Sequence, residues 1–138
     1  MNPLILILGK SFSKLSKLFN LGHGSTWPGH IALKLNPNFI ADNLSKSKTK
    51  TILLTGTNGK TTTAKLLETI LEKNNQTVFL NSSGANLLNG IASSIILKSS
   101  LKGKLKYDYA IFEVDENTVP IVLSELVPDY LEHHPWGL

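Results

Sequence analysis

At 138 residues with a net charge of +4, the chain has the length of one ordinary domain and can bury a core of its own. The absence of cysteine excludes a disulfide framework, a thiol nucleophile and a cysteine-ligated zinc site, and it fits a reducing cytoplasm. All 14 basic residues are lysines that precede Tyr107, without the arginines and interleaved aromatic residues of a nucleic-acid surface, so nucleic acid is not an expected partner.

The first residues predict an amphipathic helix. From Leu8 to Phe19, large apolar residues recur at spacings of four, three and four, and lysines occupy the opposite side. Most such helices pack on their own protein, and we favour packing over the alternative, a peripheral contact of residues 4–20 with the inner face of the membrane. The apolar run Leu4–Leu8 is too short for a secretory signal or a membrane span.

The next segment is expected to be irregular at first. Residues 21–29 are rich in glycine and contain Pro28, which predicts a linker. The alternation of apolar residues over Ile31–Leu35 predicts a short strand. Asn36-Pro37 then predicts the start of a helix that ends near Ser45.

The stretch TILLTGTNGKTTT, Thr51–Thr63, is the feature around which the other predicted elements are arranged. Its pattern is that of a short apolar strand, a glycine turn and the first turn of a helix. Glycines let the backbone approach a ligand closely, and free N–H groups at a helix start attract anions, so the stretch suits the phosphates of a nucleoside triphosphate. Its first glycine is Gly56, which makes it a shortened form of the general phosphate loop. A hairpin at Asn58-Gly59 is disfavoured, because a helical pattern follows.

Lys60 is the candidate catalytic residue, since its compact positive charge would lie beside the β and γ phosphates of ATP. Thr61 supplies the hydroxyl expected on Mg²⁺, whereas Thr62 and Thr63 could cap the helix as readily as bind a ligand. The expected ATP-binding residues are those of the loop and the first helical turn: Gly56, Thr57, Asn58, Gly59, Lys60, Thr61 and Thr62.

Beyond the loop, helices and strands alternate. A helix is expected over Lys60–Asn74, then a strand over Thr77–Leu80, a helix up to Ile96 and a third strand over Tyr109–Val114. This order predicts an α/β fold with a parallel sheet, flanking helices on both faces and right-handed crossovers. Three polar residues after the second strand are either substrate contacts or turn formers: Asn81, Ser83 and Asn86.

The third strand ends in acidic residues. Glu113 closes the apolar run YAIF, at the position where phosphate-loop proteins carry a second magnesium-side acid. Asp115 lies two residues further on and would share its side of the strand, so it is the rival metal ligand, and strand phase favours Glu113. A charged strand end without any ligand is the alternative to both.

The pattern changes after Pro128. A short helix is expected over Thr118–Leu126, and a buried strand should follow, but LEHHPWGL offers two histidines and a proline in place of an apolar run. His133 and His134 are interpreted as tail residues and not as metal ligands. We therefore expect a lead-in segment, a partial ATP-binding domain and a divergent tail, over residues 1–45, 46–130 and 131–138.

The motif TGTNGKTTT at Thr55–Thr63 resembles the ATP-binding loop of the Mur ligase family, whose members join amino acids or ammonia to carboxylates through an acyl phosphate. The resemblance implies the central domain of that family, with a P-loop NTPase-like fold. It also implies that Gly56, Gly59 and Lys60 bind the ATP phosphates, and that Thr61 and Glu113 hold Mg²⁺.

Three further stretches resemble one branch of this family, the Mur-ligase-like subunit of lipid II isoglutaminyl synthase. They are STWPGHIALKLNP, SGANLLNGIAS and EVDENTVP, which begin at Ser25, Ser83 and Glu113. The resemblance implies amidation of the stem-peptide glutamate in a lipid-linked peptidoglycan precursor. It also implies a glutaminase partner subunit that delivers the ammonia.

Several features of the family do not follow Pro128: an apolar strand, an asparagine and acidic motif near the nucleotide, a cysteine-ligated zinc insertion and a C-terminal domain. We therefore expect an incomplete ATP-binding domain, truncated or frameshifted near Tyr130, that does not catalyse amidation alone. The alternative is a stand-alone ATP-binding module without ligase activity, completed at its open sheet edge by another chain.

Overall fold

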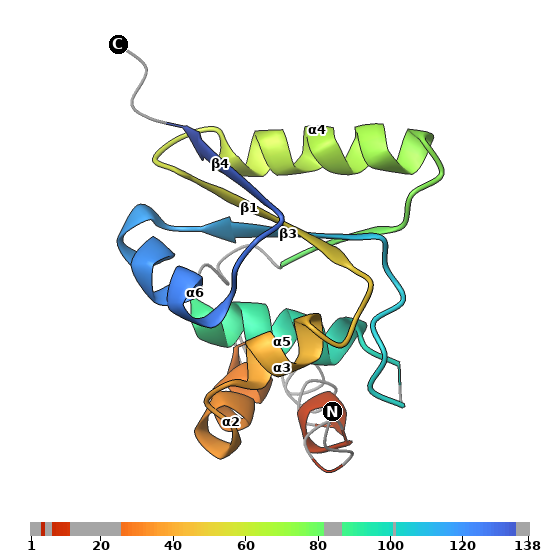
Figure 1. The fold of residues 1–138 in the computed structure, drawn as a ribbon, viewed down its shortest axis with the longest axis vertical. Helices are drawn as coiled ribbons and strands as arrows, with labels where there is room; N and C mark the ends of the chain where they lie inside the picture. The colour runs from red at the N-terminus through yellow and green to blue at the C-terminus, as the bar shows by residue number, and fades with distance from the viewer. Residues whose placement is uncertain (1–3, 5–6, 12–25, 82–86, 101, 135–138) are drawn as a thin grey trace.

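The computed structural model describes residues 4, 7–11, 26–81, 87–100 and 102–134, and the structural statements below concern these residues. Their fold is a parallel four-stranded sheet with the strand order β2-β3-β1-β4 and helices on both faces (Figure 1). The predicted α/β architecture is therefore confirmed. The strands are β1 (Lys50–Gly56), β2 (Val78–Leu80), β3 (Tyr109–Val114) and β4 (Tyr130–His134).

The helices form one layer on each side of the sheet. Figure 1 shows α4 alone above the strands and the other helices below them. On that lower side α2 packs along α5, which lies against the larger core. The helices are α2 (Trp27–Leu35), α3 (Phe39–Leu44), α4 (Lys60–Lys73), α5 (Leu88–Lys98) and α6 (Val119–Glu125), and a 3-10 turn, Glu116–Thr118, precedes α6.

The strand β1 is buried from Thr51 to Gly56, because it lies between β3 and β4 with helices on both faces. Its side chains alternate between two cores. Leu53 packs into the larger core below the sheet, whereas Ile52 and Leu54 pack into the smaller core under α4. A nearly continuous apolar strand of this kind is typical of a parallel sheet. This burial gives the loop that follows β1 a rigid base.

The segment Trp27–Leu35 is a helix, so the prediction of a linker followed by a short strand is wrong here. Pro28 lies in the first turn, where its missing N–H and fixed φ suit a helix start. The buried residues Pro28, Gly29 and Ala32 are spaced as one helical face, and that face packs on α5. The Gly29 N–H donates a hydrogen bond to Ser93 Oγ at 2.8 Å.

The helix predicted after Asn36 is present as α3, but it begins at Phe39. The Asn38 N–H donates a hydrogen bond to Asn36 Oδ1 at 3.1 Å, and this turn delays the helix start. Of the amphipathic helix predicted from Leu8 to Phe19, residues 8–11 are helical and the remainder lies outside the described residues.

A fourth strand follows Pro128, which corrects the prediction that no strand occurs there. β4 runs parallel to β1 along its whole length, so β1 is not an open edge. In the described part of the chain β4 itself is an edge strand, and Tyr130 and Leu131 are half exposed. An edge strand does not need the apolar run expected of a buried one. The backbone of His133 and His134 therefore belongs to the sheet.

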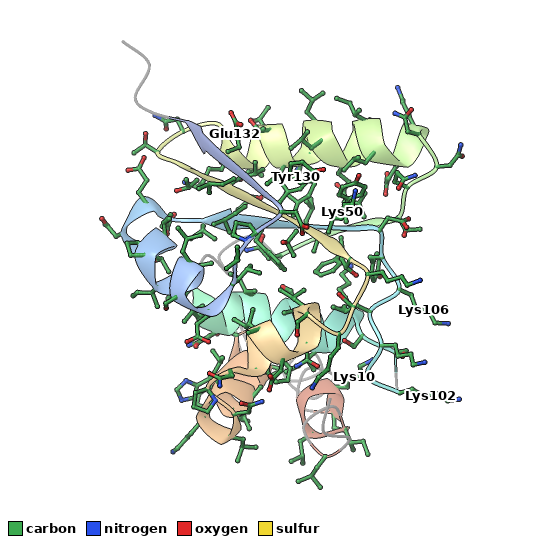
Figure 2. All side chains as sticks on the ribbon, in the orientation of Figure 1. Lys10, Lys50, Lys102, Lys106, Tyr130 and Glu132 are labelled. Carbon is green, nitrogen blue, oxygen red and sulfur yellow. The ribbon has the colours of Figure 1, made fainter. Side chains whose placement is uncertain are left out.

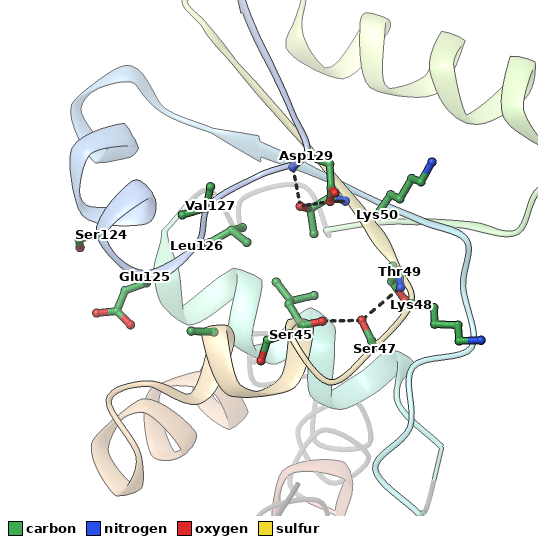
Figure 3. Close-up of a pocket in the computed structure, with 13 residues that line it drawn as sticks. Ser45, Ser47, Lys48, Thr49, Lys50, Ser124, Glu125, Leu126, Val127 and Asp129 are labelled. Carbon is green, nitrogen blue, oxygen red and sulfur yellow. Dashed lines mark hydrogen bonds between the residues drawn. The ribbon is translucent and has the colours of Figure 1, made fainter.

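Two aspartates fasten the amino ends of neighbouring strands in the same way, and we call these contacts the Asp–Thr clasps. Asp129, before β4, accepts hydrogen bonds from the Thr51 N–H at 2.7 Å and Oγ1 at 3.0 Å. Asp108, before β3, accepts them from the Thr77 N–H at 2.8 Å and Oγ1 at 2.7 Å. Figure 3 shows the Asp129 clasp beside a hollow of about 560 Å³.

Acid should weaken both Asp–Thr clasps. The hydrogen bond from the Thr77 backbone holds the pKa of Asp108 below its ordinary value of 3.8, and the Thr51 backbone does the same for the pKa of Asp129. A carboxylate with a lowered folded-state pKa stabilises the fold above its unfolded-state pKa and loses that contribution as the pH falls through the folded-state value. The free energy of unfolding should therefore fall below pH 3.8.

The Asp108→Asn/Asp129→Asn double variant should lose stability less steeply than the parent over this acid range, as measured by urea unfolding at a series of pH values. Glu68→Gln/Glu72→Gln removes two carboxylates from α4 and serves as the charge-matched control, which should keep the parent slope. A parental slope in the Asp108→Asn/Asp129→Asn variant would show that the clasps do not determine the acid sensitivity.

Replacing Gly29 should destabilise the chain although it lies within a helix. A Cβ at Gly29 would lie 1.9 Å from Asn89 O and 2.7 Å from Ser93 N on α5, and neither backbone atom can move away alone. We expect Gly29→Ala to lower the free energy of unfolding by about 2 kcal/mol or more, as measured by urea titration. Gly59→Ala serves as a comparison, because its Cβ meets nothing within 4 Å and any loss of stability there comes from its positive φ alone. Unchanged or raised stability in Gly29→Ala would refute the close packing of α2 on α5.

Candidate phosphate-binding site

The loop between β1 and α4 lies at the carboxyl edge of the sheet. β1 ends at Gly56, which has a φ of 133°, and Gly59 precedes α4 with a φ of 82°. Both values lie in the region that favours glycine. Residues 57–59 are exposed, and the space beside Gly59 is open. The backbone of the predicted phosphate loop is therefore accessible to a ligand.

The first turn of α4 directs N–H groups toward this loop. The first hydrogen bond of the helix joins the Thr63 N–H to Gly59 O at 2.9 Å. The N–H groups of Lys60, Thr61 and Thr62 precede that bond and have no acceptor within the helix. The positive end of the dipole of this 14-residue helix lies at the same place. Together these groups form the start of a site for an anion.

The Lys60 side chain folds back over the loop. Its Nζ donates a hydrogen bond to Gly56 O and lies 3.6 Å from Asp115 Oδ1. The lysine side chain is 15% exposed and the aspartate side chain 50%, so water screens the pair and its contribution to stability is small. The ammonium can therefore exchange Asp115 for a phosphate at little cost.

Thr61 and Glu113 meet at the carboxyl edge although 52 positions separate them in the sequence. The Thr61 Oγ1 donates a hydrogen bond to Glu113 Oε2 at 2.6 Å. The pairing of β1 with β3 produces this contact, because it places Glu113 opposite Leu54. The structure brings together the two residues predicted to hold Mg²⁺, and it places the rival, Asp115, beside Lys60 instead.

The oxygens of Thr61 and Glu113 fit a magnesium ion. Mg²⁺ binds oxygens at about 2.0–2.1 Å in octahedral geometry, which puts neighbouring ligand oxygens about 2.9 Å apart. The 2.6 Å between Thr61 Oγ1 and Glu113 Oε2 is close to that spacing. In nucleotide sites, one or two protein oxygens suffice, because phosphate and water complete the shell. The described residues contain no cluster of three or more His, Asp or Glu side chains suited to a metal.

Asn81 positions Glu113, a role that its place in the sequence does not reveal. Its Oδ1 accepts a hydrogen bond from the Glu113 N–H at 2.9 Å, and its Nδ2 donates one to Glu113 O at 3.0 Å. The Asn81 N–H donates to Ile111 O at 3.2 Å, so the residue continues the pairing of β2 with β3. The Asn81 side chain is buried and bonds both backbone groups of Glu113, so Asn81 holds Glu113 in position. The other two polar candidates, Ser83 and Asn86, lie outside the described residues.

Residues 54–129 match the model of the Mur ligase middle domain, and this stretch contains the loop, α4 and the acidic end of β3. The match covers more than half of the 138 residues. The chain belongs to the Mur ligase family, which confirms the resemblance inferred from the loop motif.

Two relatives are similar to most of this chain. The chain is 36% identical over 108 residues to the lipid II isoglutaminyl synthase (glutamine-hydrolyzing) subunit MurT of Staphylococcus aureus strain COL. It is 38% identical over 112 residues to the subunit of the same name from Streptococcus pneumoniae strain ATCC BAA-255 / R6. These alignments cover 78% and 80% of this chain but 24% of each relative, so the chain spans about a quarter of their length.

Removing the Asn81 side chain should loosen Glu113. Asn81→Ala leaves the N–H and C=O groups of Glu113 without these partners, which should lower the free energy of unfolding by about 1–3 kcal/mol. Glu113 should also move away from Thr61, so ATP binding measured by calorimetry should depend less on Mg²⁺. Asn74→Ala, at the far end of α4, is the control and should keep the parental Mg²⁺ dependence. If Asn81→Ala kept the parental Mg²⁺ dependence, Asn81 would not be the residue that positions Glu113.

Proposed function

We propose that this chain supplies the ATP-binding site of an ATP-dependent ligase that amidates the stem-peptide glutamate of lipid II, with ammonia from a glutaminase partner subunit. The observation that carries the proposal is the contact between Thr61 and Glu113 beside Lys60, at the carboxyl edge of a parallel sheet. The names of both relatives support the substrate and the ammonia source, since each is a subunit of a glutamine-hydrolyzing lipid II isoglutaminyl synthase.

The nucleotide phosphates would occupy the space above the first turn of α4. The N–H groups of the loop and of Lys60–Thr62 would bind phosphate oxygens, as the partial positive charge of a helix start favours. Lys60 would turn from Gly56 O to the β and γ phosphates. At an effective dielectric constant of about 20, such a charge contact at about 4 Å amounts to roughly 4 kcal/mol before desolvation.

Mg²⁺, when bound, would neutralise the negative charge on the phosphates. Thr61 Oγ1 and the Glu113 carboxylate would hold the ion, and Asn81 would keep Glu113 in position through its backbone. Asp115 would remain near Lys60 and orient the ammonium. Each of these residues would act by positioning a charged group. Positioning and electrostatic stabilisation account for most of the rate enhancement in phosphoryl transfer.

The proposed reaction has two steps. An oxygen of the glutamate carboxylate attacks the γ phosphorus of ATP, the bond to the bridging oxygen breaks, and ADP leaves an acyl phosphate behind. Ammonia then attacks the acyl carbon, inorganic phosphate leaves, and nitrogen loses a proton to give the amide. For this chain on its own, we expect the binding of ATP without amidation.

The lipid-linked acceptor makes a membrane contact part of the proposal. Residues 4–20 are the segment proposed for a peripheral contact, and Ile7 and Leu8 within it are exposed. None of the helices among the described residues is long and apolar enough to cross a bilayer.

Lys60→Ala should weaken nucleotide binding. Calorimetry with Mg-ATP and with a non-hydrolysable analogue should detect binding of both by the parent chain. Loss of one charged contact should weaken this binding roughly 10- to 100-fold. Lys65→Ala, an exposed lysine one turn further along α4, is the matched control and should bind like the parent. No binding by the parent, or equal binding by Lys60→Ala, would refute the phosphate site.

A further inference from the structure

The amino edge of the sheet carries a hollow that the proposed function does not use. The hollow measures about 580 Å³ and lies between the α3–β1 connection and the segment that precedes β3. We call it the lysine hollow, because its lining includes five lysines: Lys46, Lys48, Lys102, Lys104 and Lys106.

The lysine hollow is strongly positive. Asp108 is the one carboxylate in its lining, and it accepts the hydrogen bonds from Thr77 described above. Over the part of the chain that the structure describes, none of the five lysines forms an ion pair within 4.0 Å. Like charges gathered around one hollow repel each other, and a surface of opposite charge relieves that repulsion.

Exposed apolar side chains lie on the amino-terminal helix. Ile7 is 61% exposed and Leu8 is 49% exposed on the amino-terminal helix. Lys10 of the same helix donates a hydrogen bond to Ser99 O at the end of α5, which fastens the helix next to the segment containing Lys102. Figure 2 shows Lys102 and Lys106 at one border of the molecule, and Lys10 inward of them, where the amino-terminal helix meets the end of α5. The hydrogen bond from Lys10 to Ser99 O thus places the helix that carries Ile7 and Leu8 near the basic segment that contains Lys102.

We propose that the lysine hollow and the exposed side of the amino-terminal helix dock on an anionic lipid bilayer. The lysines would bind the phosphate head groups, and Ile7 and Leu8 would enter the interfacial layer. A nucleic acid fits this surface less well for two reasons. The chain has no arginine, and exposed apolar side chains gain nothing from contact with a phosphate backbone. Docking of this kind would bring the chain to the membrane that carries the lipid-linked acceptor. The link to the acceptor rests on the proposed function, whereas lipid binding itself does not.

Docking by the amino edge would hold the phosphate loop away from the lipid. The seven residues of β1 separate the two edges of the sheet, which corresponds to about 23 Å of extended strand. The lysines of the hollow are thus too far from the phosphate loop to share its ligand. Lipid binding and nucleotide binding can therefore be tested separately.

Co-sedimentation of the full chain with vesicles tests the proposal. Binding should require phosphatidylglycerol in phosphatidylcholine vesicles and should weaken as salt is raised. The triple variant Lys102→Gln/Lys104→Gln/Lys106→Gln should bind more weakly by about fivefold per lysine, or roughly 100-fold in all. Ile7→Ser/Leu8→Ser should also weaken binding to the same vesicles.

A second triple variant, Lys34→Gln/Lys65→Gln/Lys73→Gln, removes the same charge elsewhere and should bind nearly as the parent does. Equal losses in the two triple variants, equal binding to neutral vesicles, or binding to duplex DNA without binding to vesicles would each overturn the proposal. The first triple variant should bind Mg-ATP like the parent, and Lys60→Ala should bind vesicles like the parent. Failure of lipid docking is thereby distinguished from failure of the nucleotide site.

Discussion

The parallel pairing of β1 with β3 is the contact on which the rest of the site depends. It joins six residue pairs and sets Leu54 against Glu113. Because β1 leads into the loop and β3 ends in the acid, this single register determines how far Thr61 lies from Glu113. A slip of one residue would turn Glu113 to the opposite face of the sheet. The buried apolar residues of both strands make such a slip costly, so the cores on the two faces of the sheet protect the geometry of the site at its carboxyl edge.

The parts of the site that were predictable from the sequence depend on local patterns. Glycine turns, a lysine at a helix start and an apolar strand each have a recognisable sequence, and so Gly56, Gly59, Lys60 and the acidic end of β3 were found. The meeting of Thr61 with Glu113 followed from a general property, since parallel strands bring their carboxyl ends to one edge. From the sequence, the choice between Glu113 and Asp115 as metal ligand depended on strand phase alone. In the structure Glu113 contacts Thr61, whereas Asp115 contacts Lys60.

The parts that the sequence did not reveal depend on which elements are neighbours. Asn81 follows a strand like any turn residue, and its importance comes from the presence of β3 beside β2. In α2, Pro28 signals a helix start as well as a break, and only the packing on α5 decides between them. β4 lacks the apolar run of a buried strand because, among the described residues, it is an edge strand. Its pairing with β1 is therefore invisible to any argument from hydrophobic pattern.

The Asp–Thr clasps carry a consequence for the order in which the molecule folds. They connect positions 31 and 78 residues apart, so each would have to close a long loop of chain before it could form. We expect contacts of that separation to form late, after the crossover helices have brought their strands together. Interactions that are absent from the folding transition state hardly change the folding rate, but they slow unfolding. We therefore expect Asp108 and Asp129 to slow the unfolding of the sheet without being needed to start its formation.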